Sequence, residues 1–186
     1  MANRKKIVSH LITRQDPVLV IIDVQERLMP VITENSKVIS NISRLLKFCL
    51  LTGIPVITTE QEKLGDTVQE IRQGLPPHSI VPKVHFDSFS CEEFAHRIKK
   101  LRRKTLILAG VEAHICVAQT ALNALPSYRV QVVSDAISSR TRDNRDVALE
   151  RLRGAGVTVT STEMFIYEIL RKAGTDEFKA ALPLVK

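Results

Sequence analysis

The sequence predicts an α/β fold, a three-layer α/β/α sandwich around a Rossmann-like six-stranded parallel sheet of strand order 3-2-1-4-5-6. Short β-branched runs alternate along the chain with segments of helical periodicity, which is typical of a parallel sheet with helices on both faces. The run Val18–Ile22 is wholly apolar, as in a strand covered on both faces. With 186 residues, of which 44% are hydrophobic and 25% charged, we expect residues 1–186 to form one domain with its core at about 17–170.

The alternation places each element in turn. Strands are expected at residues 18–22, 56–59, 79–83, 105–109, 130–134 and 157–160. Apolar residues at helical spacing predict helices between them, at about 39–50, 94–101, 116–124 and 147–152. The pair Thr160 and Glu163 has the spacing of a capping box for a last helix that carries Met164, Ile166 and Leu170.

Composition narrows the class of protein. The longest apolar run is far shorter than the roughly 20 residues that cross a bilayer, so no membrane span is expected. The basic start, MANRKKIVSH, has no apolar core behind it and does not resemble a secretory signal. Three cysteines are an odd number without a CxxC motif, which favours a reducing, cytoplasmic location.

Metal and cofactor motifs are missing from the sequence. The five histidines form no HxxxH, HxH or DxH pair, whereas a zinc site needs three or four ligands. There is no GxGxxG, Walker A or GxSxG motif, and Gly110, Gly154 and Gly156 are interpreted as turn or helix-end glycines. We therefore expect neither a metal nor a cofactor.

Three side chains follow strand ends where this fold places its sites, outside the carboxyl ends of the strands at the point where strand order reverses. Asp23 ends the first strand and Lys83 the third, and Cys116 follows the fourth where a helix begins. Strands one and four are neighbours in the expected order, so Asp23 and Cys116 should face each other.

Each of these residues has a functional and a structural interpretation. Near a helix N-terminus Cys116 would have a lowered pKa and act as a nucleophile, but a lone cysteine is also a common buried apolar residue. Asp23 could move a proton or cap a turn, with Gln25 beside it to orient it. Lys83 could tune both charges or extend its head into water. The other cysteines, Cys49 and Cys91, are interpreted as structural.

The motif segments resemble the isochorismatase-like cysteine hydrolases, most closely the short stand-alone members. The matching segments, in order, are Val18–Gln25, Pro82–Lys83, Leu108–Val117 and Val133–Ala136, with Ser138–Arg140 behind them. The chain departs from the metal-binding nicotinamidases of this family, since it has Glu60-Gln61-Glu62 and no Asp-x-His pair, and Ala113-His114 replaces the usual Thr-Asp.

The resemblance implies a catalytic triad of Asp23, Lys83 and Cys116. It also implies a non-proline cis peptide at Val111–Glu112. This bond would turn the amide of Glu112 toward that of Cys116, so that the two amides form an oxyanion hole. The resemblance further implies a homo-oligomer. We interpret the protein as a metal-independent hydrolase of a small amide-type (C–N) or related substrate acting through a thioester, while vinyl-ether chemistry stays open.

The substrate pocket is expected to include Gln25, Phe86, Phe89 and His114. Two other classes remain. A catalytically silent ligand-binding or scaffold protein would keep the fold and lose thiol activation. A nucleic-acid-binding protein would use the net charge of +7 and the six basic residues in 97–104, although aromatic residues make up only 4% of the chain.

Overall fold

The computed structural model describes residues 11–186, and residues 1–10, on which the signal-peptide expectation rests, lie outside them. Its centre is an all-parallel sheet of order β3-β2-β1-β4-β5-β6, which confirms the predicted fold class and strand order. The strands are β1 (Pro17–Ile22), β2 (Val56–Gln61), β3 (Ile80–Lys83), β4 (Thr105–Val111), β5 (Arg129–Ser138) and β6 (Thr158–Thr160).

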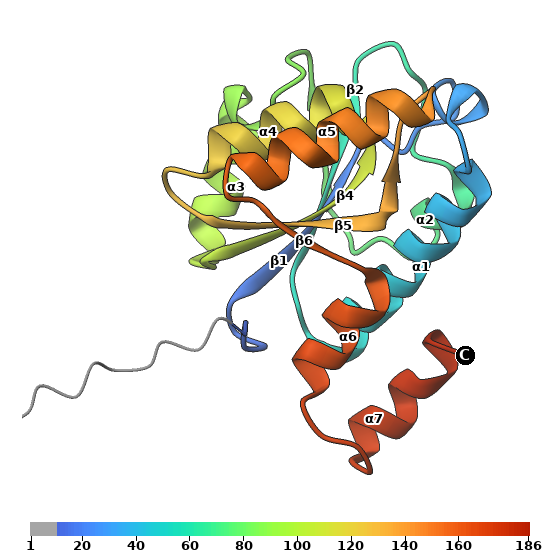
Figure 1. Ribbon diagram of the computed structural model, residues 1–186, viewed down its shortest axis with the longest axis vertical. Coiled ribbons are helices and arrows are strands. Elements are labelled where there is room, and N and C mark those ends of the chain that lie inside the picture. The colour runs from blue at the N-terminus through green and yellow to red at the C-terminus, as the bar shows by residue number, and fades with distance from the viewer. Residues whose placement is uncertain (1–10) are drawn as a thin grey trace, which may run out of the picture.

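Helices cover both faces of the sheet (Figure 1). One face packs against α3 (Glu92–Leu101), α4 (Ala118–Ala124) and α5 (Arg142–Gly154). The other face packs chiefly against α1 (Asn35–Thr52) and α6 (Thr162–Leu170). The short helices α2 (Gln69–Arg72) and α7 (Asp176–Ala181) lie on this second side, as Figure 1 shows.

Strand β1 shows why the apolar run at the start of the chain is a central strand. All six of its residues are buried, and it pairs with β2 on one side and β4 on the other. Successive side chains alternate between faces, so Leu19 and Ile21 enter the core under α1 while Val18 and Val20 enter the core under α4. A strand with two buried faces needs a continuous apolar sequence.

The structure corrects the predicted start of the last helix. Ser161, not Thr160, is the N-cap residue of α6, and its hydroxyl accepts a hydrogen bond from the backbone N–H of Met164. Thr160 still belongs to β6, where its hydroxyl is buried and has no partner among residues 11–186. The chain therefore leaves the strand one residue later than a Thr160–Glu163 capping box requires.

Other element boundaries also differ from the expected ones. Strand β5 extends four residues beyond its predicted end to Ser138, and its pairing with β4 shifts register between Leu108 and Gly110. Helices α2 and α7 have only four and six residues, too few for a periodic apolar pattern to show in the sequence. Within the described residues, no helix is long and apolar enough to cross a membrane.

Candidate active site

The carboxyl ends of the central strands surround a cavity of about 230 Å³. Asp23 follows β1, Gln61 ends β2 and Cys116 follows β4, as expected at the point where the strand order reverses. The lining consists of Asp23, Leu28, Gln61, Leu64, Phe86, Glu112, Ile115, Cys116 and Arg140.

A buried ion pair forms the polar floor of this region. The ammonium Nζ of Lys83 lies 2.7 Å from Oδ2 of Asp23, and neither side chain is exposed to solvent. Nζ also donates to Oε1 of Gln61 at 2.8 Å and to the backbone oxygen of His85 at 3.1 Å. All three donors of the ammonium therefore have partners, which a buried charge requires.

The other oxygen of Asp23 is held by Thr59. The hydroxyl Oγ1 of Thr59 donates to Oδ1 of Asp23 at 2.6 Å, and both residues are fully buried. Asp23 itself adopts a left-handed backbone conformation with φ of 52°, which is uncommon for a residue other than glycine and is found more often at functional sites. The carboxylate is thus fixed from two neighbouring strands.

Gly110 lets β1 and β4 come close enough for this arrangement. It lies within β4 and not in a turn, so the interpretation as a turn glycine is wrong. Its φ is +117°, and a Cβ added there would lie 2.1 Å from the backbone oxygen of Ile22, the residue before Asp23. A side chain at this position would push apart the two strands that bring Asp23 and Cys116 together.

Cys116 lies in a π-helical turn, Ala113–Val117, that joins β4 to α4. Burial raises the pKa of its thiol to about 12, and the negative charge of Asp23 adds to this increase while Lys83 opposes it. The expected lowering of this pKa by a helix N-terminus is therefore wrong, because the short helix begins only at Ala118 and burial dominates. At rest the residue is a protonated thiol beside a carboxylate.

The peptide bond between Val111 and Glu112 is cis. The side chain of Glu112 is buried and its carboxylate is held by Arg140, whose backbone N–H donates at 2.9 Å and whose Nε donates at 3.1 and 3.2 Å to the two oxygens. Burial by itself would raise the pKa of Glu112, but the hydrogen bonds and charge of Arg140 outweigh it and the pKa is lowered.

Three other residues expected in the pocket lie outside its lining, whereas Phe86 belongs to it. The side-chain amide of Gln25 is fully buried and bonded to the backbone of Gln61 and Gly65. His114 Nδ1 lies 2.9 Å from the hydroxyl of Ser139. Phe89 packs in the core under α3, with its ring centroid 5.1 Å from that of Phe94.

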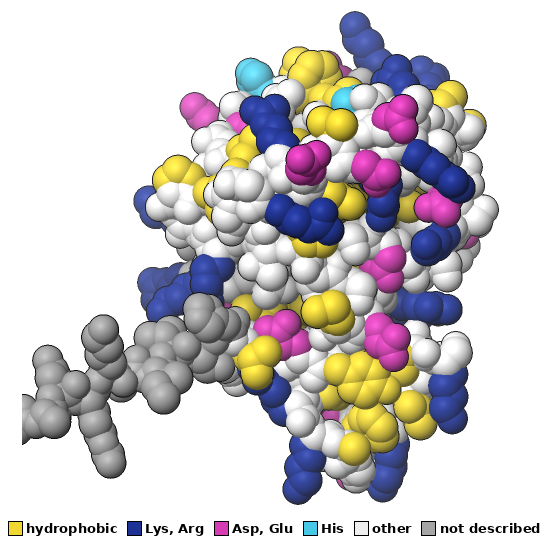
Figure 2. All heavy atoms as spheres, viewed as in Figure 1, with side chains coloured by type: hydrophobic (Ala, Val, Ile, Leu, Met, Phe, Trp, Pro, Cys, Tyr) yellow, Lys and Arg dark blue, Asp and Glu magenta, His cyan; other side chains and the backbone are white. Residues whose placement is uncertain are grey.

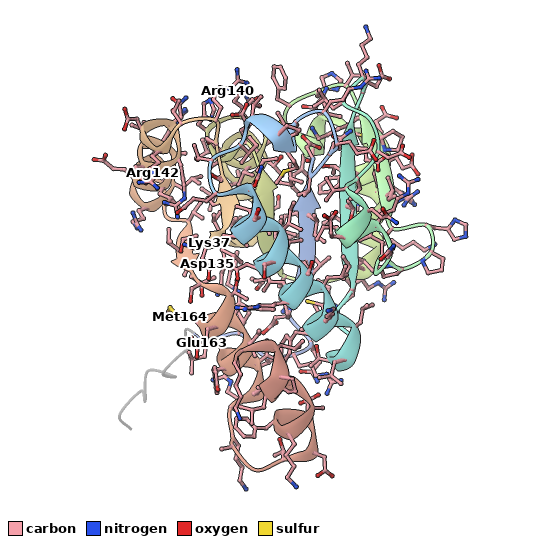
Figure 3. The ribbon with its side chains drawn as sticks, turned by 90° about the vertical axis from the view of Figure 1, so that its right-hand side faces the viewer. Lys37, Asp135, Arg140, Arg142, Glu163 and Met164 are labelled. Atoms are coloured by element: carbon pink, nitrogen blue, oxygen red, sulfur yellow. The ribbon has the colours of Figure 1, made fainter. Side chains whose placement is uncertain are left out.

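Sequence reasoning missed three polar residues that hold the site together, Thr59, Gln61 and Arg140. The signal for the first two is their place at the end of β2, which adjoins β1. Arg140 and Asp135 come from one motif segment but serve different parts of the fold, since Asp135 accepts hydrogen bonds from Thr162 at the start of α6. Figure 3 shows Arg140 at the upper end of the molecule, well above Asp135.

Among residues 11–186, no group of three or more His, Cys, Asp or Glu side chains is arranged to hold a metal ion. The ionisable groups at the cavity are instead two carboxylates, one ammonium, one guanidinium and one thiol. This set can move protons, attack an electrophile and stabilise negative charge.

A buried thiol lies beside a fixed carboxylate at the switch point of a 3-2-1-4-5-6 sheet, in an α/β fold. The chain belongs to the isochorismatase family, since the model of the isochorismatase domain matches residues 17–164. It is 38% identical to the secreted isochorismatase effector Isc1 of Phytophthora sojae over 91% of this chain and 84% of that one.

Two solved structures illustrate the likeness of fold. The MAR1 ribonuclease of Caenorhabditis elegans is 31% identical, with a TM-score of 0.88 over 94% of this chain and 92% of that one. The YcaC gene product of Escherichia coli, described as an octameric hydrolase of unknown specificity, is 24% identical with a TM-score of 0.89, over 96% and 91% of the two chains.

Proposed function

We propose that the protein is a metal-independent cysteine hydrolase that cleaves a small amide-type (C–N) or related bond through Asp23, Lys83 and Cys116. The observation that supports this most directly is the meeting of the thiol with the buried Asp23–Lys83 pair beside a cavity. Arrangements in which a thiol, a base and an orienting cation lie within reach of one another are typical of covalent catalysis.

The raised pKa of Cys116 requires a base in the reaction. In our proposal Asp23 takes the thiol proton as the sulfur attacks the substrate carbonyl, and the new C–S bond replaces the C–N bond. The proton then passes from Asp23 to the leaving amine, which leaves a thioester. Water, deprotonated by Asp23, releases the acid and the proton returns to the sulfur. Lys83 stabilises the carboxylate between these transfers.

The oxyanion of each tetrahedral intermediate would be held by the backbone amides of Glu112 and Cys116. Both residues lie in the lining of the cavity, and the amide of Glu112 is the nitrogen of the cis peptide bond between Val111 and Glu112. Two amides fixed by the backbone need no rearrangement when the negative charge develops, which is the basis of this kind of stabilisation.

The cavity favours a small and largely apolar substrate. Its walls include the side chains of Leu28, Leu64, Phe86 and Ile115, and its volume of about 230 Å³ lies below the usual range for drug-sized ligands. Arg140 and Glu112 add an ion pair at the same cavity, without net charge. A small molecule with one polar, cleavable group fits these features better than a polymer does.

Two measurements test the triad. The first is iodoacetamide modification of Cys116 against pH, followed by peptide mass spectrometry. Because Asp23 raises the pKa of the thiol and Lys83 lowers it, Asp23→Asn should speed modification near neutral pH and Lys83→Met should slow it. The second is trapping of an acyl-enzyme with p-nitrophenyl acetate, which should acetylate Cys116 in the wild type, with Cys91→Ala as the matched cysteine control.

The outcome separates the enzyme from its alternatives. A panel of small amides and vinyl ethers hydrolysed by the wild type, and by neither Cys116→Ala nor Asp23→Asn, would support the hydrolase. Equal modification rates in all three proteins, together with no acetylation of Cys116, would leave a silent ligand-binding or scaffold protein as the better description.

An RNA substrate is less well supported, although one similar structure is that of a ribonuclease. The basic run at 97–104 covers the second half of α3 and the connection to the start of β4, so it is at the opposite edge of the sheet from Cys116. On the face shown in Figure 2, Lys and Arg side chains are scattered and do not form one stripe. No continuous basic surface on that face therefore leads from the run to the thiol (Figure 2).

We also propose a homo-oligomer in a reducing, cytoplasmic environment. Phe86 at the cavity and Val84 nearby in sequence are 55% and 61% exposed, and such exposed apolar groups are common at interfaces. All three cysteines are free, which suits a reducing compartment. Sedimentation of the purified protein as a monomer at micromolar concentration would contradict the oligomer.

A further inference from the structure

A second cavity, of about 380 Å³, lies at the opposite edge of the sheet from Cys116. It is formed where β2 begins, beside the segment that leads into β3, and it is covered by α3. The lining consists of Pro55, Val56, Ile57, Pro76, Pro77, His78, Ser79, Arg97, Lys100 and Leu101.

This cavity is separate from the candidate active site. Strand β2 runs from Val56 at the second cavity to Gln61 at the first, six residues whose Cα atoms span about 17 Å of extended chain. No residue belongs to both linings. A ligand here would not touch Asp23, Lys83 or Cys116, so the inference does not depend on the proposed catalytic function.

The lining combines apolar walls with positive charge. Pro55, Val56 and Ile57 contribute the apolar surface, and Arg97 and Lys100 come from successive turns of α3. Arg97 is paired with Glu93 one turn earlier. In contrast, no ion pair found within residues 11–186 uses Lys100, so its ammonium remains available to a ligand.

The walls of the cavity are held in place before any ligand binds. The guanidinium of Arg97 donates to the backbone oxygens of His78 and Ile80, which ties α3 to the segment before β3. Pro76 and Pro77 restrict the backbone of that segment. Residues that are already fixed lose little conformational entropy when a ligand binds, and this favours specific binding at the cavity.

One buried hydroxyl group in the lining has no hydrogen-bond partner among the described residues. The hydroxyl of Ser79 is buried and makes no hydrogen bond to any described residue. Buried hydroxyl groups are nearly always hydrogen-bonded in folded proteins. Because Ser79 lines the cavity, rotation about its Cα–Cβ bond is the movement that would offer the hydroxyl to a ligand oxygen.

We propose that this cavity binds a small amphipathic anion, an apolar body carrying one carboxylate or similar acidic group. The body would pack against Pro55, Val56 and Ile57, and the acidic group would lie at the ammonium of Lys100 within reach of the Ser79 hydroxyl. The two acidic residues of the same helix, Glu92 and Glu93, lie in its first turn and outside the lining, and Glu93 is already paired with Arg97.

Methyl NMR of the full-length protein, titrated with benzoate, tests the proposal. Ile57 reports on the second cavity and Ile115 on the candidate active site. The Ile57 methyl resonance should shift and saturate with benzoate, and the uncharged analogue benzyl alcohol should bind more weakly. Lys100→Ala should weaken benzoate binding about three- to fivefold, the effect of removing one exposed charge.

Lys99→Ala is the matched control, because it removes the same charge from the same helix but lies outside the lining. Ser79→Ala should also weaken benzoate binding, and the methyl spectrum of this variant should remain that of a folded protein. The proposal is overturned if Ile57 does not respond, if only Ile115 responds, or if Lys99→Ala weakens binding as much as Lys100→Ala. An equal response to benzyl alcohol would also overturn it, since the site would then be merely apolar.

Discussion

At the scale of single residues, the carboxylate of Glu112 depends on one arginine. Glu112 is only 3% exposed, and Arg140 supplies its hydrogen bonds. Arg140→Leu should lower the free energy of unfolding by about 1–3 kcal/mol at pH 7, less than for a wholly buried pair because more than half of the arginine side chain is exposed. Urea denaturation measures this loss.

The loss should depend on pH in a defined direction. Since the pKa of Glu112 is lowered in the folded state, the stabilisation is complete above the unfolded pKa of about 4.3 and disappears as the pH falls through the folded value. Arg142→Leu, at a residue whose contact with Glu34 is 3.9 Å, is the matched control and should be nearly neutral. A deficit that persists undiminished in acid would contradict this account of Arg140.

The site shows which residues a single sequence can and cannot predict. The positions of Asp23, Lys83 and Cys116 were predictable because each lies at or just beyond the carboxyl end of a strand, and the alternation of elements indicated the strand order. The pKa of Cys116 was not predictable from the sequence, since it depends on burial, which the side chain acquires only in the folded protein. The partnership of Glu112 with Arg140 links segments 28 residues apart and has no local pattern.

At the scale of secondary-structure elements, the contact between β1 and β4 depends on the missing side chain of Gly110. A Cβ at this position would overlap the backbone of Ile22, which cannot move without displacing a central strand. Gly110→Ala should therefore lower the free energy of unfolding by more than about 3 kcal/mol, measured by thermal or urea denaturation.

Gly154→Ala provides the comparison within the same chain. Gly154 is the last residue of α5, and a Cβ there would meet nothing within 4 Å. This substitution should be neutral or stabilising by up to about 1 kcal/mol, because alanine favours the helix over glycine. Similar effects of the two substitutions would show that the strand contact does not set the requirement at Gly110.

The start of α6 gives a second test at this scale. Ser161→Ala removes the hydroxyl that accepts from Met164 and should cost about 1 kcal/mol of stability. Thr160→Val is the matched change at the neighbouring position, since it removes a hydroxyl that caps nothing and keeps the shape of the side chain. If Thr160→Val were the more destabilising of the two by circular-dichroism melting, the predicted capping box would be restored and the observed cap rejected.

The elements were predictable where a continuous apolar run marks them in the sequence. Buried strands such as β1 and β4 have continuous apolar sequences, and their predicted and observed ranges overlap closely. The extension of β5 to Ser138 includes polar residues and a shift in register, so the sequence did not indicate it. Boundaries depend on tertiary pairing, which a local pattern does not contain.

At the scale of the whole molecule, the two cavities lie at opposite edges of one sheet. The sheet's carboxyl edge carries the thiol and the ion pair, and its amino edge carries the end of α3 with its basic run. A parallel sheet separates these edges by the full length of its strands, so the positive charge of one does not neutralise the groups of the other. That residues 1–186 form one domain stays a prediction.

Two buried thiols should make the folded protein sensitive to alkali. Burial raises the pKa of Cys49, and that of Cys116 rises to about 12, whereas an unfolded thiol ionises near pH 8.5. Above about pH 9 the unfolded chain therefore binds fewer protons than the folded one. The free energy of unfolding should fall by about 1.4 kcal/mol per pH unit for each such thiol, and the full contribution is present only below the unfolded pKa.

Cys116→Ala should remove one of these two contributions. Between about pH 9 and 11 the fall in stability with pH should be shallower by about 1.4 kcal/mol per unit than in the wild type, as measured by urea denaturation at each pH. Lysine and tyrosine ionisation is common to both proteins and cancels in the difference. Cys91→Ala, at a thiol that is only partly buried, controls for loss of a cysteine as such. If Cys91→Ala and Cys116→Ala changed the slope equally, burial of the active-site thiol would not be the cause, and the protonated resting state assigned to Cys116 would have to be abandoned.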